Sequence, residues 1–301
     1  MDIESARSFI YRNARPLDIA RWRFLFENGC REDVLSCLEA YQNSDGGFGY
    51  ALEPDCWNPN SSPMQTWAAS EIIREVNLGD AAHPIIRGML AYLESTAAFD
   101  GHIWANTIPS NDEHPHAPWW NYSPSREVTY NPTASLAGFI IKYADHSSAL
   151  YAAAVRIAKE AYEYFAANQP LDSMHTVSCY VELFEYLREC GADIGIDIGS
   201  FELQLKEQLK HVLTQDTSVW DKEYVCKPSL FIHSRQSVFY SEYMALCGYE
   251  CEFISRSQKA DGTWNITWEW GSYPEQWSIS KNWWKSDLII KNVYFYNAMH
   301  L

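Results

Sequence analysis

The sequence predicts an all-α fold built from a repeated helical unit. The segment 42–48 reads Q-N-S-D-G-G-F, and the segment 258–264 reads Q-K-A-D-G-T-W. Each copy follows an amphipathic helical run, and no segment shows period-two alternation long enough for a sheet. A motif that recurs after helices in this way is typical of repeat proteins.

Both copies of the motif follow the pattern Q-x-x-D-G-x-aromatic. The glycine permits the backbone angle that a tight turn after aspartate needs, and the glutamine amide can satisfy a free group at a helix end. We therefore expect each copy to join an outer helix to an inner one. The large ring of Phe48 or Trp264 should fold back over the turn.

In the first half of the chain, turn and cap signals separate the helices. Pro16 suits a first helical position and Gly29 suits a C-terminal stop. Ser62 should cap the helix that starts at Pro63, and because this helix is apolar on most sides we expect it to be an inner helix. The helices expected here cover residues 3–13, 17–28, 31–42, 63–76 and 84–96.

The second half of the chain continues the alternation of outer and inner helices. Asn131-Pro132 should open an inner helix, and the two expected helix starts at Pro63 and Pro132 share the pattern P-x-x-[ST]-x-A. The expected helices form six pairs, and a closed ring of six pairs needs no capping repeats. The remaining helices are expected at 148–167, 173–190, 199–215, 230–247, 249–258 and 285–299.

The two Q-x-x-D-G-x-aromatic segments resemble the QW repeats of the terpenoid cyclases, the squalene-hopene cyclases among them, and of the related protein prenyltransferase β-subunits. The resemblance implies an (α/α)6 toroid of six inner and six outer helices in a single domain spanning 1–301. It also implies an enzyme that acts on a hydrophobic, isoprenoid-type substrate. The chain departs from both families in its chemistry: no two aspartates are adjacent, so the D-x-D-D acid is missing, and Asp55-Cys56 lacks the intervening residue of the prenyltransferase zinc ligands.

Composition excludes several classes of partner. A net charge of −16 argues against nucleic acid and anionic membrane surfaces, since both need clustered Lys and Arg. No run approaches a membrane span and the start of the chain is charged, so we expect a cytoplasmic protein. The expected partner is a small molecule, hydrophobic or sugar, and the sequence does not predict the oligomeric state.

Cysteine and histidine spacing gives no cofactor site. The eight cysteines contain no C-x-x-C pair, so we expect free thiols. His114 and His116 could direct two rings toward a metal, but an isolated H-x-H on a loop is a weak signal. We therefore expect neither a metal nor another cofactor.

The loops that enter the inner helices are long and aromatic, which is typical of functional loops. In a ring of helix pairs they would gather at one end of a central cavity, and we place the site there. Few cations accompany them, among them Arg126, Arg235, Lys281 and Lys285, so a diphosphate group would find little counter-charge. The loops cover residues 50–62, 101–130, 222–229 and 265–285.

Glu53 or Asp55 is the expected acid/base group, because a carboxylic acid held in an aromatic wall has its pKa raised by desolvation. The same two carboxylates could instead cap a helix or loop. His116, His175 and His233 are expected auxiliary polar groups, although His175 could equally be a satisfied core histidine. The expected wall consists of Trp57, Trp67, Trp104, Trp119, Trp120, Tyr130, Trp268 and Trp270.

Two other functions fit the same residues. Rings of six helix pairs also occur in carbohydrate hydrolases, lyases and epimerases, and Glu53 or Asp55 opposed by Glu269 would suit glycosidic cleavage. Aromatic side chains stack on sugar rings as well as on cations. The third possibility is a non-catalytic ligand-binding module, in which the tryptophans only pack beneath the loops.

Overall fold

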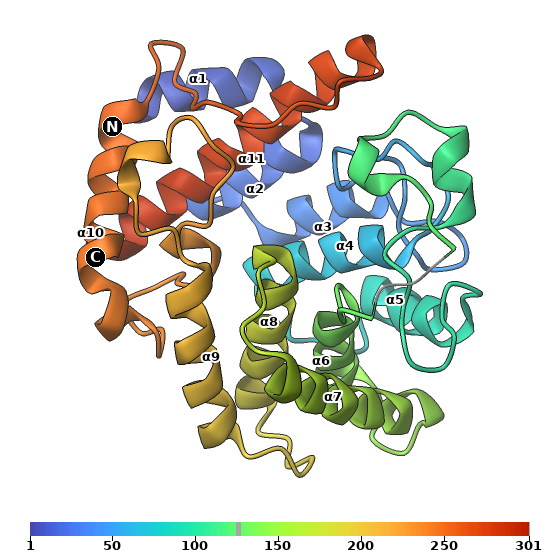
Figure 1. The fold of residues 1–301 in the computed structure, drawn as a ribbon. Coiled ribbons are helices and arrows are strands. Elements are labelled where there is room, and N and C mark those ends of the chain that lie inside the picture. The colour runs from blue at the N-terminus through green and yellow to red at the C-terminus, as the bar shows by residue number, and fades with distance from the viewer. Residues whose placement is uncertain (125–127, 301) are drawn as a thin grey trace. The chain divides into compact units, whose positions relative to one another are not determined.

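The computed structural model describes residues 1–124 and 128–300. It is all-helical, with 60% of the chain in helices and no strand among the described residues, which confirms the predicted all-α class. The chain divides into two compact units (Figure 1). Unit 1 combines Met1–Ala40 with Leu213–Leu301, and unit 2 is the continuous segment Tyr41–Val212. A single domain stays a prediction, and each unit is described by itself.

Unit 1 is organised around its longest helix, α11, which packs against α1, α2 and α10. Two short 3-10 helices, η3 (Thr217–Val219) and η4 (Pro228–Leu230), precede α10. The α-helices of unit 1 are α1 (Ile3–Asn13), α2 (Pro16–Phe26), α3 (Arg31–Glu39), α10 (Tyr240–Ser257) and α11 (Pro274–His300).

Unit 2 has its core where α6 packs against α7 and α8. Every residue of α6 except Lys142 is buried, so this helix is enclosed on nearly all sides. The loop between α5 and α6 contains the 3-10 helices η1 (Pro109–Glu113) and η2 (Pro118–Trp120). The α-helices of unit 2 are α4 (Pro63–Glu75), α5 (Pro84–Ser95), α6 (Thr133–Tyr143), α7 (Ala149–Asn168), α8 (Met174–Cys190) and α9 (Ile198–Val212).

Capping residues lie at the ends of two helices that carry site residues, α4 and α8. The Ser62 side chain accepts a hydrogen bond from the Gln65 backbone N–H, and Pro63 occupies the first turn of α4, as predicted. At the other end of the site, α8 begins at a Ser173 cap and ends at Gly191 in the left-handed conformation. These caps set where α4 and α8 start and stop.

The first Q-x-x-D-G turn fastens α5 of unit 2. The Gln42 Nε2 atom donates to the carbonyl oxygens of Gly46 and Ile85 at 2.9 and 3.1 Å, and Ile85 lies in the first turn of α5. The ring of Phe48 is fully buried. The glutamine therefore ties its own turn to the start of a neighbouring helix.

The second Q-x-x-D-G turn makes the same connection to α1 of unit 1. Gln258 Nε2 donates to the carbonyl oxygens of Gly262 and Asp2 at 3.2 and 2.9 Å, and its Oε1 accepts from the Asp2 N–H at 2.6 Å. Asp2 is the N-cap of α1. The indole N–H of Trp264 donates to the Ile254 carbonyl at 2.9 Å. The amide thus serves a helix end, as the motif predicts.

Two predicted boundaries in unit 1 are wrong. The expected helices 230–247 and 249–258 are replaced by α10, which is kinked at Tyr243 and continues past residue 248. Residues 234–239 stay outside the helix, where the Ser234 and Ser237 side chains accept from the backbone N–H groups of Gln236 and Phe239 and hold turns. Eleven α-helices therefore occupy the described residues, where twelve were expected. The last helix begins at Pro274 rather than at residue 285, since Pro274 followed by an acidic first turn starts a helix.

None of the helices in the described residues is long and apolar enough to cross a membrane.

Candidate active site

Helix α8 of unit 2 holds the carboxyl group of Glu182 in the middle of a buried stretch. Residues 176–184 are all buried, and Glu182 is only 7% exposed. Gly138 of α6 allows the two helices to approach closely, because a Cβ at that position would lie 2.7 Å from the Tyr186 ring and 3.2 Å from the Leu183 Cα. The close packing of α6 and α8 encloses the glutamate.

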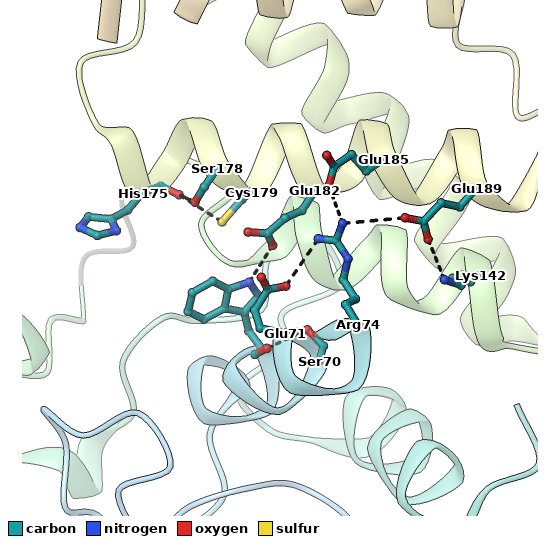
Figure 2. Close-up of polar contacts among 11 residues, drawn as sticks. Ser70, Glu71, Arg74, Lys142, His175, Ser178, Cys179, Glu182, Glu185 and Glu189 are labelled. Atoms are coloured by element: carbon teal, nitrogen blue, oxygen red, sulfur yellow. Dashed lines mark hydrogen bonds and ion pairs between the residues drawn. The ribbon is translucent and has the colours of Figure 1, made fainter. Parts of the chain in front are cut away.

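Helix α4 supplies the groups that face Glu182. Trp67 donates its indole N–H to Glu182 Oε2 at 2.8 Å (Figure 2). Trp67, Glu71 and Arg74 share one face of α4, since they are four and then three residues apart. Trp67 is only half-buried, so the residue that hydrogen-bonds the acid also reaches the surface.

Arg74 neutralises part of the negative charge around the site. Its guanidinium forms ion pairs with Glu185, with Glu71 at 3.7 Å and with Glu189 at 4.0 Å, and it lies 4.7 Å above the Tyr186 ring. Burial alone would lower the pKa of Arg74, but the surrounding carboxylates raise it. Arg74 is therefore a permanently charged counter-ion.

Three buried polar atoms in this cluster lack hydrogen-bond partners among residues 1–124 and 128–300. They are Glu71 Oε1, Ser135 Oγ and Tyr186 Oη. Ser135 and Tyr186 are fully buried, and the Ser135 hydroxyl faces Glu182 closely enough to favour its charged form without forming a well-aligned bond. Glu71 Oε1 still faces the Arg74 guanidinium at 3.7 Å, so its charge is compensated without a hydrogen bond. Buried polar atoms without a hydrogen bond are uncommon in proteins, and here three of them lie around a buried acid.

Burial sets the protonation of Glu182. It raises the pKa of Glu182 to about 8, and the neighbouring Glu71 carboxylate acts in the same direction. Arg74 and the Trp67 N–H oppose this rise without cancelling it. At neutral pH the group is therefore a carboxylic acid that can donate a proton. The carboxylate left behind would face the Trp67 N–H and the positive charge of Arg74.

The raised pKa makes the stability of the fold depend on pH. In the folded protein Glu182 keeps its proton at pH values at which it would be ionised in the unfolded chain. Its contribution to stability is therefore complete below the unfolded pKa and is lost as the pH rises through the folded pKa. We expect the free energy of unfolding of Glu182→Gln to increase relative to that of the parent protein, by on the order of 3 kcal/mol, as the pH rises from about 5 to about 8. Urea unfolding at the two pH values measures this difference.

A matched control for the pH experiment is Glu250→Gln in unit 1. Glu250 is also fully buried and its pKa is raised to about 7, mainly by desolvation. Glu250→Gln should remove a separate part of the pH dependence of the free energy of unfolding. That part is complete at a lower pH, because the folded pKa of Glu250 is lower than that of Glu182. Parallel stability curves for Glu182→Gln and the parent protein would show that Glu182 is ionised in the folded state.

The structure places Glu53 and Asp55 in the loop before α4, where both are buried. The Glu53 carboxylate accepts from the Asp55 N–H at 3.1 Å, and the Glu53 N–H donates to Gln65 Oε1 at 2.7 Å. The Asp55 carbonyl accepts from the Ala117 N–H at 2.8 Å. These contacts join the 50–62 loop to the 101–130 loop, and none of them involves Glu182.

His116 is the predicted auxiliary group that this loop junction contains. Its backbone forms a β-bridge with Cys56, its Nδ1 lies 2.6 Å from the His114 carbonyl and its Nε2 lies 2.7 Å from Asn121 Oδ1. Both ring nitrogens thus hold the loop. Among the described residues, no group of three or more His, Cys, Asp or Glu side chains could hold a metal ion.

His175 lies on the first turn of α8, where its side chain is exposed. The Cys179 thiol lies 3.3 Å from the His175 carbonyl, and Cys179 stands between His175 and Glu182 along the helix (Figure 2). Burial raises the pKa of the Cys179 thiol. This end of α8 therefore offers a buried neutral thiol and an exposed imidazole.

The predicted aromatic wall of unit 2 divides into packing residues and surface residues, with Trp67 the member that bonds to Glu182. Trp104 is fully buried, stacks on Phe99 at 4.3 Å and donates to the Leu93 carbonyl. Tyr130 is buried and its ring lies 5.5 Å from that of Tyr164. Trp57 and Trp120 are half-buried, and Trp119 is exposed.

Four predicted site residues belong to unit 1. His233 and Glu269 are exposed there. Trp268 packs against Tyr224 and Trp284 at 5.2 and 5.4 Å. Trp270 is buried 5.6 Å from the Trp277 ring.

Sequence reasoning missed Glu182, Glu71, Arg74, Ser135 and Tyr186. The signal for Glu182 was nevertheless present, since this glutamate interrupts an apolar run on a helix that was itself expected to be inner. Carboxylates in such positions are rarely buried without a partner. The expected site was placed in the loops, so this residue in the middle of a helix was not among the candidates.

No family model matches the sequence, and no curated protein or solved structure gives a significant match. The all-helical fold and the buried acid of unit 2 are therefore the features that indicate a function.

Proposed function

We propose that this protein is an enzyme that transfers a proton from Glu182 to a hydrophobic, isoprenoid-type substrate. The proposal includes a ring of helix pairs like that of the terpenoid cyclases and prenyltransferases, a small-molecule partner and a cytoplasmic location. It keeps carboxylate acid/base chemistry as the mechanism. It assigns the acid to Glu182 instead of Glu53 or Asp55.

The observation that supports this proposal is a buried carboxylic acid with a raised pKa, hydrogen-bonded to an indole that reaches the surface. A general acid that acts at neutral pH must stay protonated until the substrate arrives, and desolvation keeps Glu182 protonated. Glu53 lies instead in the loop before α4, where its carboxylate accepts a hydrogen bond from the Asp55 N–H at 3.1 Å.

The proposed step can be written with its electrons balanced. The π electrons of a substrate alkene form a bond to the Glu182 proton, and the O–H bond breaks to leave a carboxylate. The Trp67 N–H and the Arg74 charge stabilise that carboxylate, and an aromatic face is suited to the carbocation. Loss of a proton from the cation to water completes the reaction, and a proton from solvent restores the Glu182 acid.

The charges around Glu182 favour an uncharged substrate. Arg74 is paired with glutamates, and Lys142 is paired with Glu189 at 2.7 Å. A diphosphate at this site would have to displace one of these pairs. Arg126, a cation that the sequence offered for a diphosphate, lies outside the described residues.

The test is a turnover assay in D₂O with linear polyprenyl hydrocarbons and alcohols. We expect a cyclised or rearranged product that carries one deuterium from solvent. Glu182→Gln should lower its rate of formation about a hundredfold, because a positioned general acid contributes about that much or more. Mass spectrometry of the product measures both quantities.

Glu53→Gln and Asp55→Asn are the matched controls. Both should keep most of the activity, since their carboxylates lie in a loop turn. Product formed without solvent deuterium would contradict proton donation. A Glu182→Gln protein that turns over at the parent rate would remove Glu182 from the mechanism, and no turnover of any polyprenyl substrate by the folded parent would contradict the substrate class.

A further inference from the structure

One face of α10 forms a wall of a surface hollow in unit 1. Four residues of this helix line the hollow, and their successive spacings of four, three and one place them on a single helix face. Phe253 among them is buried, whereas Arg256 is exposed. The four residues are Tyr249, Phe253, Arg256 and Ser257.

The turn that begins at η3 forms the other wall, where Thr217, Ser218 and Asp221 line the hollow. The Asp216 carboxylate accepts from the Ser218 N–H at 2.9 Å, and Asn265 Nδ2 donates to Asp221 Oδ1 at 3.0 Å. These bonds hold the turn at both of its ends. The hollow has a volume of about 300 Å³, at the lower end of the range for ligand pockets, so it suits a small molecule.

Arg256 is held in this hollow by aromatic rings. Its guanidinium carbon lies 4.9 Å from the centre of the Tyr249 ring and 5.8 Å from the centre of the Phe253 ring, and the guanidinium donates to the Tyr249 hydroxyl. The almost fully buried Trp220 packs nearly at right angles against both rings, at 5.5 and 5.7 Å. Among the described residues Arg256 forms no ion pair, so its remaining N–H groups can bind an external carboxylate.

Asp221 supplies the opposite charge from the other wall. In the part of the chain that the structure describes, its carboxylate accepts the Asn265 bond and forms no ion pair, either with Arg256 or with the adjacent Lys222. The hollow therefore contains one positive and one negative group that do not neutralise each other. A ligand with a single charge leaves one of these groups unpaired, whereas a ligand with both charges can pair with each.

Two hydroxyl groups in the lining also favour a ligand with a cationic donor. The Ser218 hydroxyl donates to the Asp216 carboxylate at 2.6 Å, and the Ser257 hydroxyl donates to the Phe253 carbonyl at 2.6 Å. Because each hydroxyl has a single hydrogen and uses it within the protein, its oxygen is left as an acceptor. Such oxygens suit the N–H groups of an ammonium ion better than they suit an anion.

We propose that this hollow binds a small zwitterion, an α-amino acid with an apolar side chain. The ligand carboxylate pairs with Arg256, the ammonium group pairs with Asp221, and the side chain contacts the Phe253 ring. A carboxylate that meets a planar guanidinium can accept two parallel N–H bonds, which are stronger than bonds between neutral groups. This inference concerns unit 1 and does not depend on the function proposed for Glu182.

The experiment titrates the full ¹⁵N-labelled chain with L-leucine and follows the backbone amide shifts by TROSY NMR. We expect saturable shifts confined to residues 216–222 and 249–257, with a dissociation constant on the order of 1 mM. Two matched compounds each keep one of the charges of leucine: 4-methylpentanoate lacks the ammonium group, and 3-methylbutylamine lacks the carboxylate. Each should bind about tenfold more weakly than leucine, because a charge-assisted hydrogen bond is lost.

Variants of the two charged residues test the pairing. Arg256→Gln and Asp221→Asn should each lower the affinity for leucine about tenfold. Lys222→Gln is the matched control, since Lys222 is exposed beside Asp221 but does not line the hollow, and it should bind leucine like the parent protein. All three positions are exposed, and the same spectra verify that each variant is folded.

Three results would overturn the proposal. The first is the absence of saturable shifts at leucine concentrations well above the expected dissociation constant, or shifts that lie elsewhere in the chain. The second is 4-methylpentanoate or 3-methylbutylamine binding as tightly as leucine, which would show that one charge is enough. The third is parental affinity in folded Arg256→Gln or Asp221→Asn, which would show that the residue does not pair with the ligand.

Discussion

Replacing Arg74 with alanine is expected to destabilise the protein by about 2 kcal/mol, because it leaves the partly buried carboxylates of Glu71 and Glu185 without their counter-charge. Arg74 is 16% exposed and pairs with Glu185 and Glu71. Urea unfolding at neutral pH measures the loss. The matched control is Arg156→Ala, since Arg156 pairs with Glu160 at 2.7 Å but is 44% exposed, and such pairs contribute roughly 1 kcal/mol or less.

A double-mutant cycle separates the ion pair from general packing. In the parent protein Glu185→Gln removes a partner of Arg74, whereas in the Arg74→Ala background it removes a partly buried charge that has lost that partner. We therefore expect Glu185→Gln to restore part of the stability that Arg74→Ala loses. Strictly additive losses would show that the guanidinium acts through packing on Tyr186 and not through its charge.

Replacing Gly46 with alanine should destabilise unit 2 by about 3 kcal/mol or more, because two costs coincide at this position. Gly46 has φ +89°, and a Cβ there would lie 2.1 Å from the carbonyl oxygen of Gly88 in α5. Neither backbone can move without breaking the Gln42 bonds to the turn and to α5. Thermal or urea unfolding measures the loss.

Two other glycines make a graded control for Gly46. Gly101 has φ +98° but open space around it, so Gly101→Ala reports the backbone strain alone, on the order of 1 kcal/mol. Gly79 has neither a positive φ nor a close neighbour, so Gly79→Ala should be nearly neutral. If Gly46→Ala behaves like Gly101→Ala, the close approach to α5 has no energetic importance.

Much of the helical pattern was predictable from sequence, because local signals and periodicity agree there. Pro16 and Ser62 start helices where capping chemistry says they should, and both Q-x-x-D-G turns form. One prediction failed where side-chain hydrogen bonds to nearby backbone groups compete with helix formation. Ser234 and Ser237 keep their segment out of a helix by bonding to nearby backbone N–H groups, and an apolar pattern does not reveal such bonds.

The site was harder to predict than the helices. Glu182 has a raised pKa because α4 and α6 surround it, and that is a property of packing between segments far apart in the chain. Trp67 was expected in the site and does bond to Glu182. Glu53 and Asp55 were expected to supply the acid because they are two carboxylates close together in an aromatic loop, and the Glu53 carboxylate accepts a hydrogen bond from the Asp55 N–H there.

The composition of unit 1 from two distant segments has a consequence for synthesis on the ribosome. Residues 1–40 leave the ribosome first, yet the helix against which α1 and α2 pack begins only at Pro274. Unit 2 is continuous in sequence, so it can fold while translation proceeds. Until α11 is made, the faces of α1 and α2 that pack against it have no native partner, and nascent chains at this stage are the natural targets of chaperones and proteases.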